Sequence, residues 1–275
     1  MPCSRCGPPP PYPGRVTLSA ASLVPVNLTL GILLAVLLLA AAAVARWYGL
    51  SPDSRTRRGR EMLFAGVRAA IQLAAVSLVI EWAVRSPWGL AAFLLVMLTV
   101  AVRTAGHRIT GNTTGWLTLA PITAGVVPVV AALLLCGLVP PKGLALIPVT
   151  GILIGGAMTV TVLAGRRALD ELTARHGEVE AALALGLPDR EARMEIARPA
   201  ASDALLPGLD QTRTVGLVTL PGAFVGMLLA GASPLRAGAV QLFVLIALMA
   251  VQSVAVAVTV ELVARGRVHR AGKEG

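Results

Sequence analysis

AGAVQLFVLIALMAVQSVAVAVTV, residues 237–260, contains no Asp, Glu, Lys or Arg. A helix needs roughly 17 to 25 apolar residues to cross the hydrocarbon core of a bilayer, so this stretch is long enough to do so. The whole chain has the same character, because 56% of its 275 residues are hydrophobic and only 14% are charged. Soluble globular domains carry more charge and less apolar surface. The sequence therefore predicts an all-α, polytopic membrane protein.

Other uncharged stretches of sufficient length occur along the chain. A less regular stretch, 62–84, qualifies if Arg68 and Glu81 near its ends extend toward water. We therefore expect about seven transmembrane helices in a permease domain at residues 25–265. Between the fifth and sixth we expect a cytosolic helical loop at about 166–213, and after the domain a cytosolic tail at 266–275. The remaining predicted spans are 25–45, 86–102, 109–141, 143–165 and 214–235.

Basic residues fall mainly on one side of these predicted spans. Of the 24 Lys and Arg residues, 19 lie in the first, third and fifth connections and in the C-terminal tail. The positive-inside rule then places the N-terminus outside the cell, and the fifth connection and the C-terminus in the cytosol. A net charge of +10 distributed in this way indicates membrane topology and anionic lipid rather than nucleic acid.

The first 24 residues have a different composition. They begin MPCSRCGPPPPYPG, which holds too much proline for a helix and no apolar run of the signal-peptide type, so we expect a disordered Pro-rich tail. Cys3 and Cys6 form a C-x-x-C pair that could bind a metal or cycle through a disulfide. No second ligand pair and no βαβ context accompany it, which disfavours both roles.

The predicted spans lack the acidic and histidine side chains that would couple transport to an ion gradient. Carriers coupled to ion gradients usually place Asp, Glu or His near the membrane midplane, whereas the acidic residues here lie in predicted loops or near span ends. A Walker A loop is missing too. The nearest match, GRVHRAGKE at 266–274, has the wrong spacing and a Glu after its Lys. We therefore expect no enzymatic activity in this chain, no cofactor, and ATP hydrolysis on a separate polypeptide.

A distinctive segment lies within the predicted fifth connection: EAALALGLPDREARMEIARP, residues 180–199. Gly186 tolerates positive φ and predicts the end of one short helix. Pro188 and Asp189 predict the start of a second, with Asp189 as its cap, and Pro199 predicts its end or a kink in it. The pattern indicates two short helices joined by a glycine bend, which by itself could be an ordinary solvated hairpin.

The spacing of this segment resembles the cytosolic coupling loop of ABC-transporter membrane subunits. That loop contacts the ATPase, and in its general pattern Leu often precedes the final Pro, whereas Arg198 stands there in this chain. The resemblance implies that ATPase-coupling residues are Glu180, Ala181, Ala182, Gly186, Ile196 and Pro199.

The second half of the chain resembles the FetB-type ABC-transporter permease family, described as iron exporters in bacteria and related to plant aluminium-tolerance membrane subunits. The matching motifs are DQTRTVGLVTLPG (210–222), PVTGILIGGAMTV (148–160), AGASPLRA (230–237) and, more weakly, VRAAIQL (67–73). The resemblance implies the permease subunit of an ATP-driven transporter in the cell inner membrane, exporting a metal ion or metal complex. It also implies two partners, a separate ABC ATPase and a second permease copy in a homodimer.

Two groups of residues are candidates for a gate or pore. The first is the signature Asp210, Arg213, Thr214, Gly216, Pro221 and Gly222. Asp210 and Arg213 could form a gating charge pair, or they could simply cap and anchor the helix entering the sixth span. The second group is Arg68 with Gln72, one helical turn apart, which would be costly facing lipid and are expected to face protein or the pore.

Metal ligands are not evident in the spans. All three histidines (His107, His176 and His269) lie in predicted cytosolic regions, and the spans offer mainly methionine thioethers, so no metal site is expected. Iron is therefore implied by resemblance alone. A secondary carrier and a membrane scaffold without transport activity remain alternatives.

Overall fold

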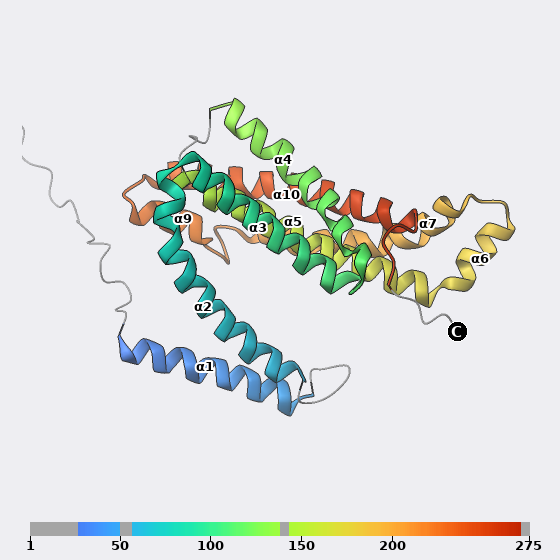
Figure 1. Cartoon of the computed structure of the whole chain (residues 1–275), viewed down its shortest axis with the longest axis horizontal. Coiled ribbons are helices and arrows are strands. Elements are labelled where there is room, and N and C mark those ends of the chain that lie inside the picture. Colours follow the sequence, from blue (N-terminus) through green and yellow to red (C-terminus); the bar gives the residue numbers. More distant parts are fainter. Residues whose placement is uncertain (1–26, 50–56, 138–142, 271–275) are drawn as a thin grey trace, which may run out of the picture. The chain divides into compact units, whose positions relative to one another are not determined.

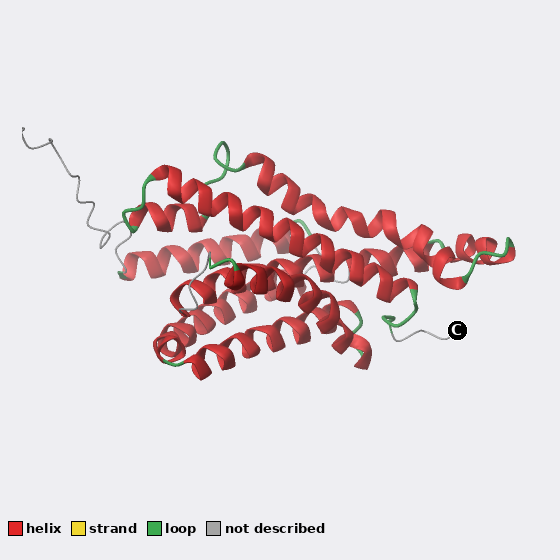
Figure 2. Ribbon diagram, turned by 90° about the horizontal axis from the view of Figure 1, so that it is seen from above, coloured by secondary structure: helices red, strands yellow, loops and turns green. Residues whose placement is uncertain are grey.

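The computed structural model describes residues 27–49, 57–137 and 143–270, and within these ranges every regular element is a helix (Figures 1 and 2). The predicted all-α class is confirmed. The predicted tail at residues 1–24, with Cys3 and Cys6, lies outside the described residues. In chain order the helices are α1 (Leu28–Trp47), α2 (Arg57–Arg85), α3 (Pro87–Ile109), η2 (Thr113–Thr118), α4 (Leu119–Leu135), α5 (Gly143–Ala174), α6 (His176–Ala184), α7 (Asp189–Ser202), η3 (Asp203–Leu205), α8 (Leu206–Thr214), α9 (Gly222–Leu229) and α10 (Pro234–Ala264).

The chain forms two compact units, of which the first holds α1, the start of α2 and residues 225–234. Small residues bring α1 and α2 close together there. A Cβ added at Gly59 would lie 2.9 Å from the carbonyl oxygen of Ala42, and one at Gly66 would lie 2.5 Å from the side chain of Leu38. The Leu38 side chain can rotate away, but the backbone of Ala42 cannot, so Gly59 sets the spacing between α1 and α2 at that point.

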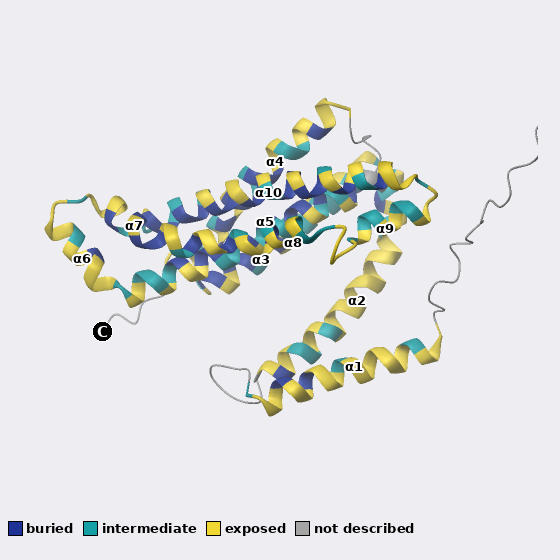
Figure 3. Cartoon of the chain, turned by 180° about the vertical axis from the view of Figure 1, so that it is seen from behind, coloured by how far each residue is buried: buried dark blue, intermediate teal, exposed yellow. Residues whose placement is uncertain are grey.

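The second unit holds residues 71–224 and 235–270, and its core joins α3, α4, α5, α7 and α10. Glycines again mark the close helix crossings. A Cβ at Gly125 of α4 would lie 2.7 Å from the carbonyl oxygen of Val251, and one at Gly156 of α5 would lie 2.2 Å from Leu248. Both neighbours are on α10, which is consequently the most buried long helix, whereas α1 and α2 expose their apolar side chains (Figure 3).

Six helices are long and apolar enough to cross a membrane, and they correspond to six of the seven predicted spans. The exception is 214–235. In the structure this stretch contains the last residue of α8, an irregular segment at 215–221, and α9, which has only 8 residues. Eight helical residues extend about 12 Å, less than half the thickness of the hydrocarbon core. The prediction of one continuous helix there is wrong.

Local backbone chemistry explains the interruption. Gly216 adopts a φ of +83°, and the carbonyl oxygen of Thr214 accepts bonds from the amides of Val218 at 2.9 Å and Leu217 at 3.3 Å, which closes a tight turn. Pro221 follows and has no amide hydrogen to donate to a helix. Hydropathy alone does not reveal such a turn, because the residues around it remain apolar.

Candidate coupling site

The predicted hairpin forms from α6 and α7, which meet at Gly186 (Figure 1). Gly186 has a φ of +88°, a conformation that L side chains rarely adopt. Its amide donates to the carbonyl oxygen of Leu183 at 2.9 Å, and the amide of Leu187 donates to that of Ala182 at 3.1 Å, so the carbonyls at the end of α6 are satisfied. The predicted glycine bend is confirmed.

Two details of α7 differ from the prediction. Asp189 is its first residue rather than its cap, and the Asp189 carboxylate accepts from Nε of Arg193 at 3.1 Å instead of from the backbone. Pro199 lies inside α7, which continues to Ser202. The helix continues because Ala197 and Ala201 remain fully buried on either side of Pro199, so packing outweighs the missing amide.

The inner face of the hairpin packs against its neighbours. Ile196 of α7 is buried with Val179 of α6 and Ala192, and Ala182 packs against the same cluster. Ile196 therefore fixes the angle between α6 and α7 and has no free surface for a partner. Of the predicted coupling residues, Glu180, Ala181, Gly186 and Pro199 are exposed.

An ion pair ties the hairpin to the end of α10. The guanidinium of Arg190 donates from Nε and Nη2 to the two carboxylate oxygens of Glu261, at 2.7 and 2.6 Å. Arg265 also donates to Glu261 at 2.6 Å. These bonds to the carboxylate raise the pKa of Arg190 above its usual value. The two-point geometry fixes both the distance and the direction between α7 and the end of α10.

The tip of the hairpin presents an apolar side chain to solvent. Leu185, between the last turn of α6 and Gly186, is 83% exposed, and Leu183 is exposed beside it. Neither lies on a helix long enough to span a membrane. The sequence analysis did not single out Leu185. Its position could have done so, because an apolar residue outside the predicted spans and directly before Gly186 is expected to be exposed at the end of a helix. Glu180 lies one turn earlier, where its carboxylate is 3.4 Å from Nδ1 of His176.

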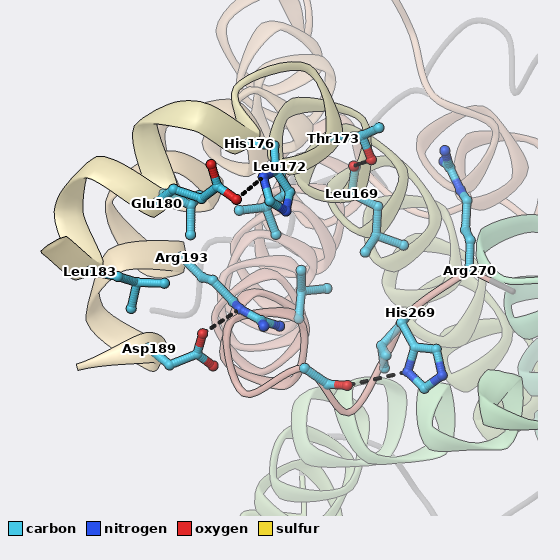
Figure 4. Close-up of a pocket in the computed structure, with 14 residues that line it drawn as sticks. Leu169, Leu172, Thr173, His176, Glu180, Leu183, Asp189, Arg193, His269 and Arg270 are labelled. Carbon is cyan, nitrogen blue, oxygen red and sulfur yellow. Dashed lines mark hydrogen bonds and ion pairs between the residues drawn. The ribbon is translucent and has the colours of Figure 1, made fainter. Parts of the chain in front are cut away.

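A cavity of about 680 Å³ lies beside the hairpin, between α5, α6, α7 and the end of α10 (Figure 4). Leu169, Leu172 and Val263 supply apolar lining, while charged lining includes Glu180 and Arg193. The segment after α10 completes it. Its residue His269 accepts a bond at its carbonyl from Nδ2 of Asn112 at 2.9 Å, and Arg270 pairs with Asp170 at 2.5 Å.

The signature residues lie apart from this hairpin, on α8 and the segment after it. Asp210 is in the middle of α8 and does not cap a helix, which contradicts the capping interpretation. Its carboxylate is 3.7 Å from Nη1 of Arg213. Thr214 ends α8, Gly216 forms the turn, and Pro221 directly precedes Gly222, the first residue of α9.

The predicted pore residues lie on a single helix. Arg68 and Gln72 lie one turn apart on α2, and both are exposed. Within the described ranges, no group of three or more His, Cys, Asp or Glu side chains is arranged to hold a metal ion.

Comparison with known proteins agrees with this architecture. The model of the uncharacterised protein family UPF0014 matches residues 29–267. The chain belongs to this family. Its relatives include "UPF0014 membrane protein STAR2" of Oryza sativa subsp. japonica, 36% identical over 219 residues, covering 78% of this chain and 76% of that protein. "Protein ALUMINUM SENSITIVE 3" of Arabidopsis thaliana is 35% identical over 189 residues, covering 67% and 69%.

A bacterial relative carries a more specific name. "Probable iron export permease protein FetB" of Escherichia coli is 30% identical over 132 residues, which cover 48% of this chain and 51% of that protein. No solved structure matches the chain. Together with the six apolar helices, these relatives identify a multi-pass membrane protein of the permease type, as the resemblance implied.

Proposed function

We propose that this chain is the membrane subunit of an ATP-driven exporter. A separate ABC ATPase docks on the tip of the α6–α7 hairpin, two copies of the chain enclose the path, and the cargo is a metal ion or a metal complex. The hairpin lies on the cytosolic side, with the N-terminus outside and the C-terminus inside. The cargo class rests on the name of the Escherichia coli relative. A complex fits spans poor in metal ligands better than a bare ion does.

The observation that carries this proposal is the exposed Leu185 at the tip of a hairpin that the Arg190–Glu261 ion pair holds to the end of α10. Exposed apolar anchors surrounded by polar residues are characteristic of binding hot spots. The glycine bend holds Leu185 at the tip, and the Arg190–Glu261 pair connects the hairpin to a transmembrane helix. A partner that pushes on the tip would thus move α10, which is what a coupling element must do.

The direct test is purification of the tagged chain from its own membranes, with ATP hydrolysis measured in the purified complex. We expect a second polypeptide that carries a Walker A motif, together with ATPase activity that the chain alone lacks. Purification of the chain in a folded state, without any ATPase, from membranes that support its transport activity would contradict the proposal.

Gly186→Val should weaken ATPase recovery, because a β-branched residue at φ +88° costs about 1 to 3 kcal/mol and displaces the tip. Gly177→Val is the matched control. An added Cβ meets nothing within 4 Å at either glycine, but Gly177 does not have a positive φ. ATPase recovery is measured at equal membrane expression. Equal recovery with both variants would argue against docking at the tip.

The predicted orientation can be checked by cysteine labelling. In a background with Cys3, Cys6 and Cys136 replaced by serine, we expect Ala181→Cys to react with an impermeant reagent only from the cytosolic side. Ser233→Cys should react only from outside. Both positions are exposed, so the reagent should reach each of them from its own side of the membrane. Labelling of both from the same side would overturn the topology.

A further inference from the structure

The depth of α8 in the membrane can be worked out from two contacts. Just before α8, Asp203 pairs at 2.8 Å with Arg167, the second of two arginines that follow the uncharged stretch of α5. Farther along, Gly208 is buried against α10, where an added Cβ would lie 2.2 Å from Oε1 of Gln252. Gln252 precedes the charged end of the α10 stretch by eight residues, or about 12 Å. α8 therefore runs from the membrane edge inward.

This direction places two charges near the middle of the bilayer. Asp210 and Arg213 follow Gly208 by two and five residues, which puts them about 15 to 20 Å from the charged end of the α10 stretch. The hydrocarbon core is about 30 Å thick, so both side chains lie near its midplane. The sequence had placed Asp210 near a span end, because it predicted that a continuous helix began at residue 214.

Neither charge is covered by the rest of the second unit. The side chain of Asp210 is 67% exposed and that of Arg213 is 72% exposed, and the 3.7 Å between them is long for an ion pair. The irregular segment that follows is similarly open, since Leu217 is 91% exposed. Charged side chains and irregular backbone at this depth do not face lipid, but instead face protein or a water-filled path.

We propose that α8 and residues 215–221 form the contact between two copies of this chain, with Asp210 of each copy facing Arg213 of the partner subunit. A two-fold axis brings the same surface of both copies together, so residue i meets residue j twice. A surface with one acid and one base, three residues apart, is complementary to itself under that symmetry. The inference rests on the proposed function, in which two copies enclose the path.

In this arrangement Asp210 and Arg213 have a role in transport. The reciprocal pairs would close the path near the midplane, and separation of the copies along α8 would open it. The contact is continuous with the interrupted backbone after Thr214, whose polar groups then border the path rather than lipid. Movement of α10 by the hairpin would reach the contact directly, because Gly208 packs against α10.

The test uses two differently tagged copies expressed together. Asp210→Arg alone places like charges opposite each other twice, and so does Arg213→Asp alone, so each should lower pairing of copies and transport by about tenfold or more. A mixture of one Asp210→Arg copy and one Arg213→Asp copy restores both pairs. We expect mixed pairs and transport to return in that mixture.

One combination of results would show that the inference is wrong. If the mixture stays as poor as either variant while the double variant Asp210→Arg, Arg213→Asp in one chain recovers, the pair lies within a chain and the inference is wrong. A second measurement does not depend on these charges. Leu217→Cys should form a disulfide between copies, and Leu135→Cys, which is equally exposed at the end of α4, should not. No crosslink at Leu217 would likewise overturn the inference.

ATPase recovery separates this inference from the proposed function. Variants at Asp210 and Arg213 leave the hairpin unchanged, so they should still recover the ATPase, which also shows that they fold. If the ATPase is recovered but the mixture of variants fails, the two copies do not meet at α8 and residues 215–221, and the exporter proposal still stands. If the unsubstituted chain recovers no ATPase, the proposed function itself fails.

Discussion

Leu185→Asp is expected to abolish recovery of the ATPase with this chain. Loss of a central apolar anchor typically costs a complex 2 kcal/mol or more, or about thirtyfold in affinity, and a buried unpaired carboxylate adds to that cost. Because Leu185 is 83% exposed in the chain itself, its replacement removes no internal packing. The measurement is the amount of ATPase that co-purifies at equal membrane expression.

The matched control introduces the same charge at the other end of α6. Gly177→Asp lies in the first turn of that helix, where a carboxylate is favourable, and an added Cβ there meets nothing within 4 Å. It should recover the ATPase at the level of the unsubstituted chain. Loss of recovery with Gly177→Asp, or normal recovery with Leu185→Asp, would remove the evidence for docking through the tip.

Arg190→Ala is expected to separate ATP hydrolysis from transport. The variant keeps the exposed tip and should still bind the ATPase, but the hairpin loses its two bonds to Glu261 and hence its polar link to the end of α10. Coupling between distant sites usually amounts to a 5- to 150-fold effect, so we expect transport to fall by about tenfold while hydrolysis continues. Both rates are measured on the same reconstituted complex.

The charge-exchanged variant provides the control for this effect. Arg190→Glu combined with Glu261→Arg places opposite charges at the same two positions and should recover part of the transport. Arg193→Ala removes a comparable arginine whose partner, Asp189, is on the same helix, so it should transport normally. If Arg190→Ala transported at the full rate, Arg190 would be an ordinary surface charge.

Six spans and the glycine bend were predictable, because each depends on local chemistry. Uncharged stretches above the length of a bilayer form helices, and Gly186 between two helix-forming segments indicates a left-handed end. Of the two predicted effects of Pro199, the end of the helix does not occur there, because the tertiary packing of Ala197 and Ala201 holds the helix together. Such packing is not visible in a local pattern.

The interrupted stretch at residues 214–235 shows a different limit of sequence reasoning. Residues 214–235 are uncharged, so hydropathy predicts one helix, but Gly216 and Pro221 divide it. Asp210 lies in the middle of α8 and not at a helix cap, and we infer from the contacts of α8 that it lies at membrane depth. That inference rests on the pair of Asp203 with Arg167 and on the contact of Gly208 with Gln252, and neither contact is visible in the sequence. The ion pair between Arg190 and Glu261 was also unpredictable, because 71 residues separate the two side chains in the sequence.

Transport by reconstituted vesicles tests the central claim most directly. Vesicles are prepared with the purified chain alone, with its co-purifying ATPase alone, and with both, and are supplied with a panel of metal ions and metal chelates. The account predicts ATP-dependent movement of a metal species only when both proteins are present, and its loss with Leu185→Asp. Equal movement by the chain alone, driven by an ion gradient and indifferent to ATP, would contradict the account.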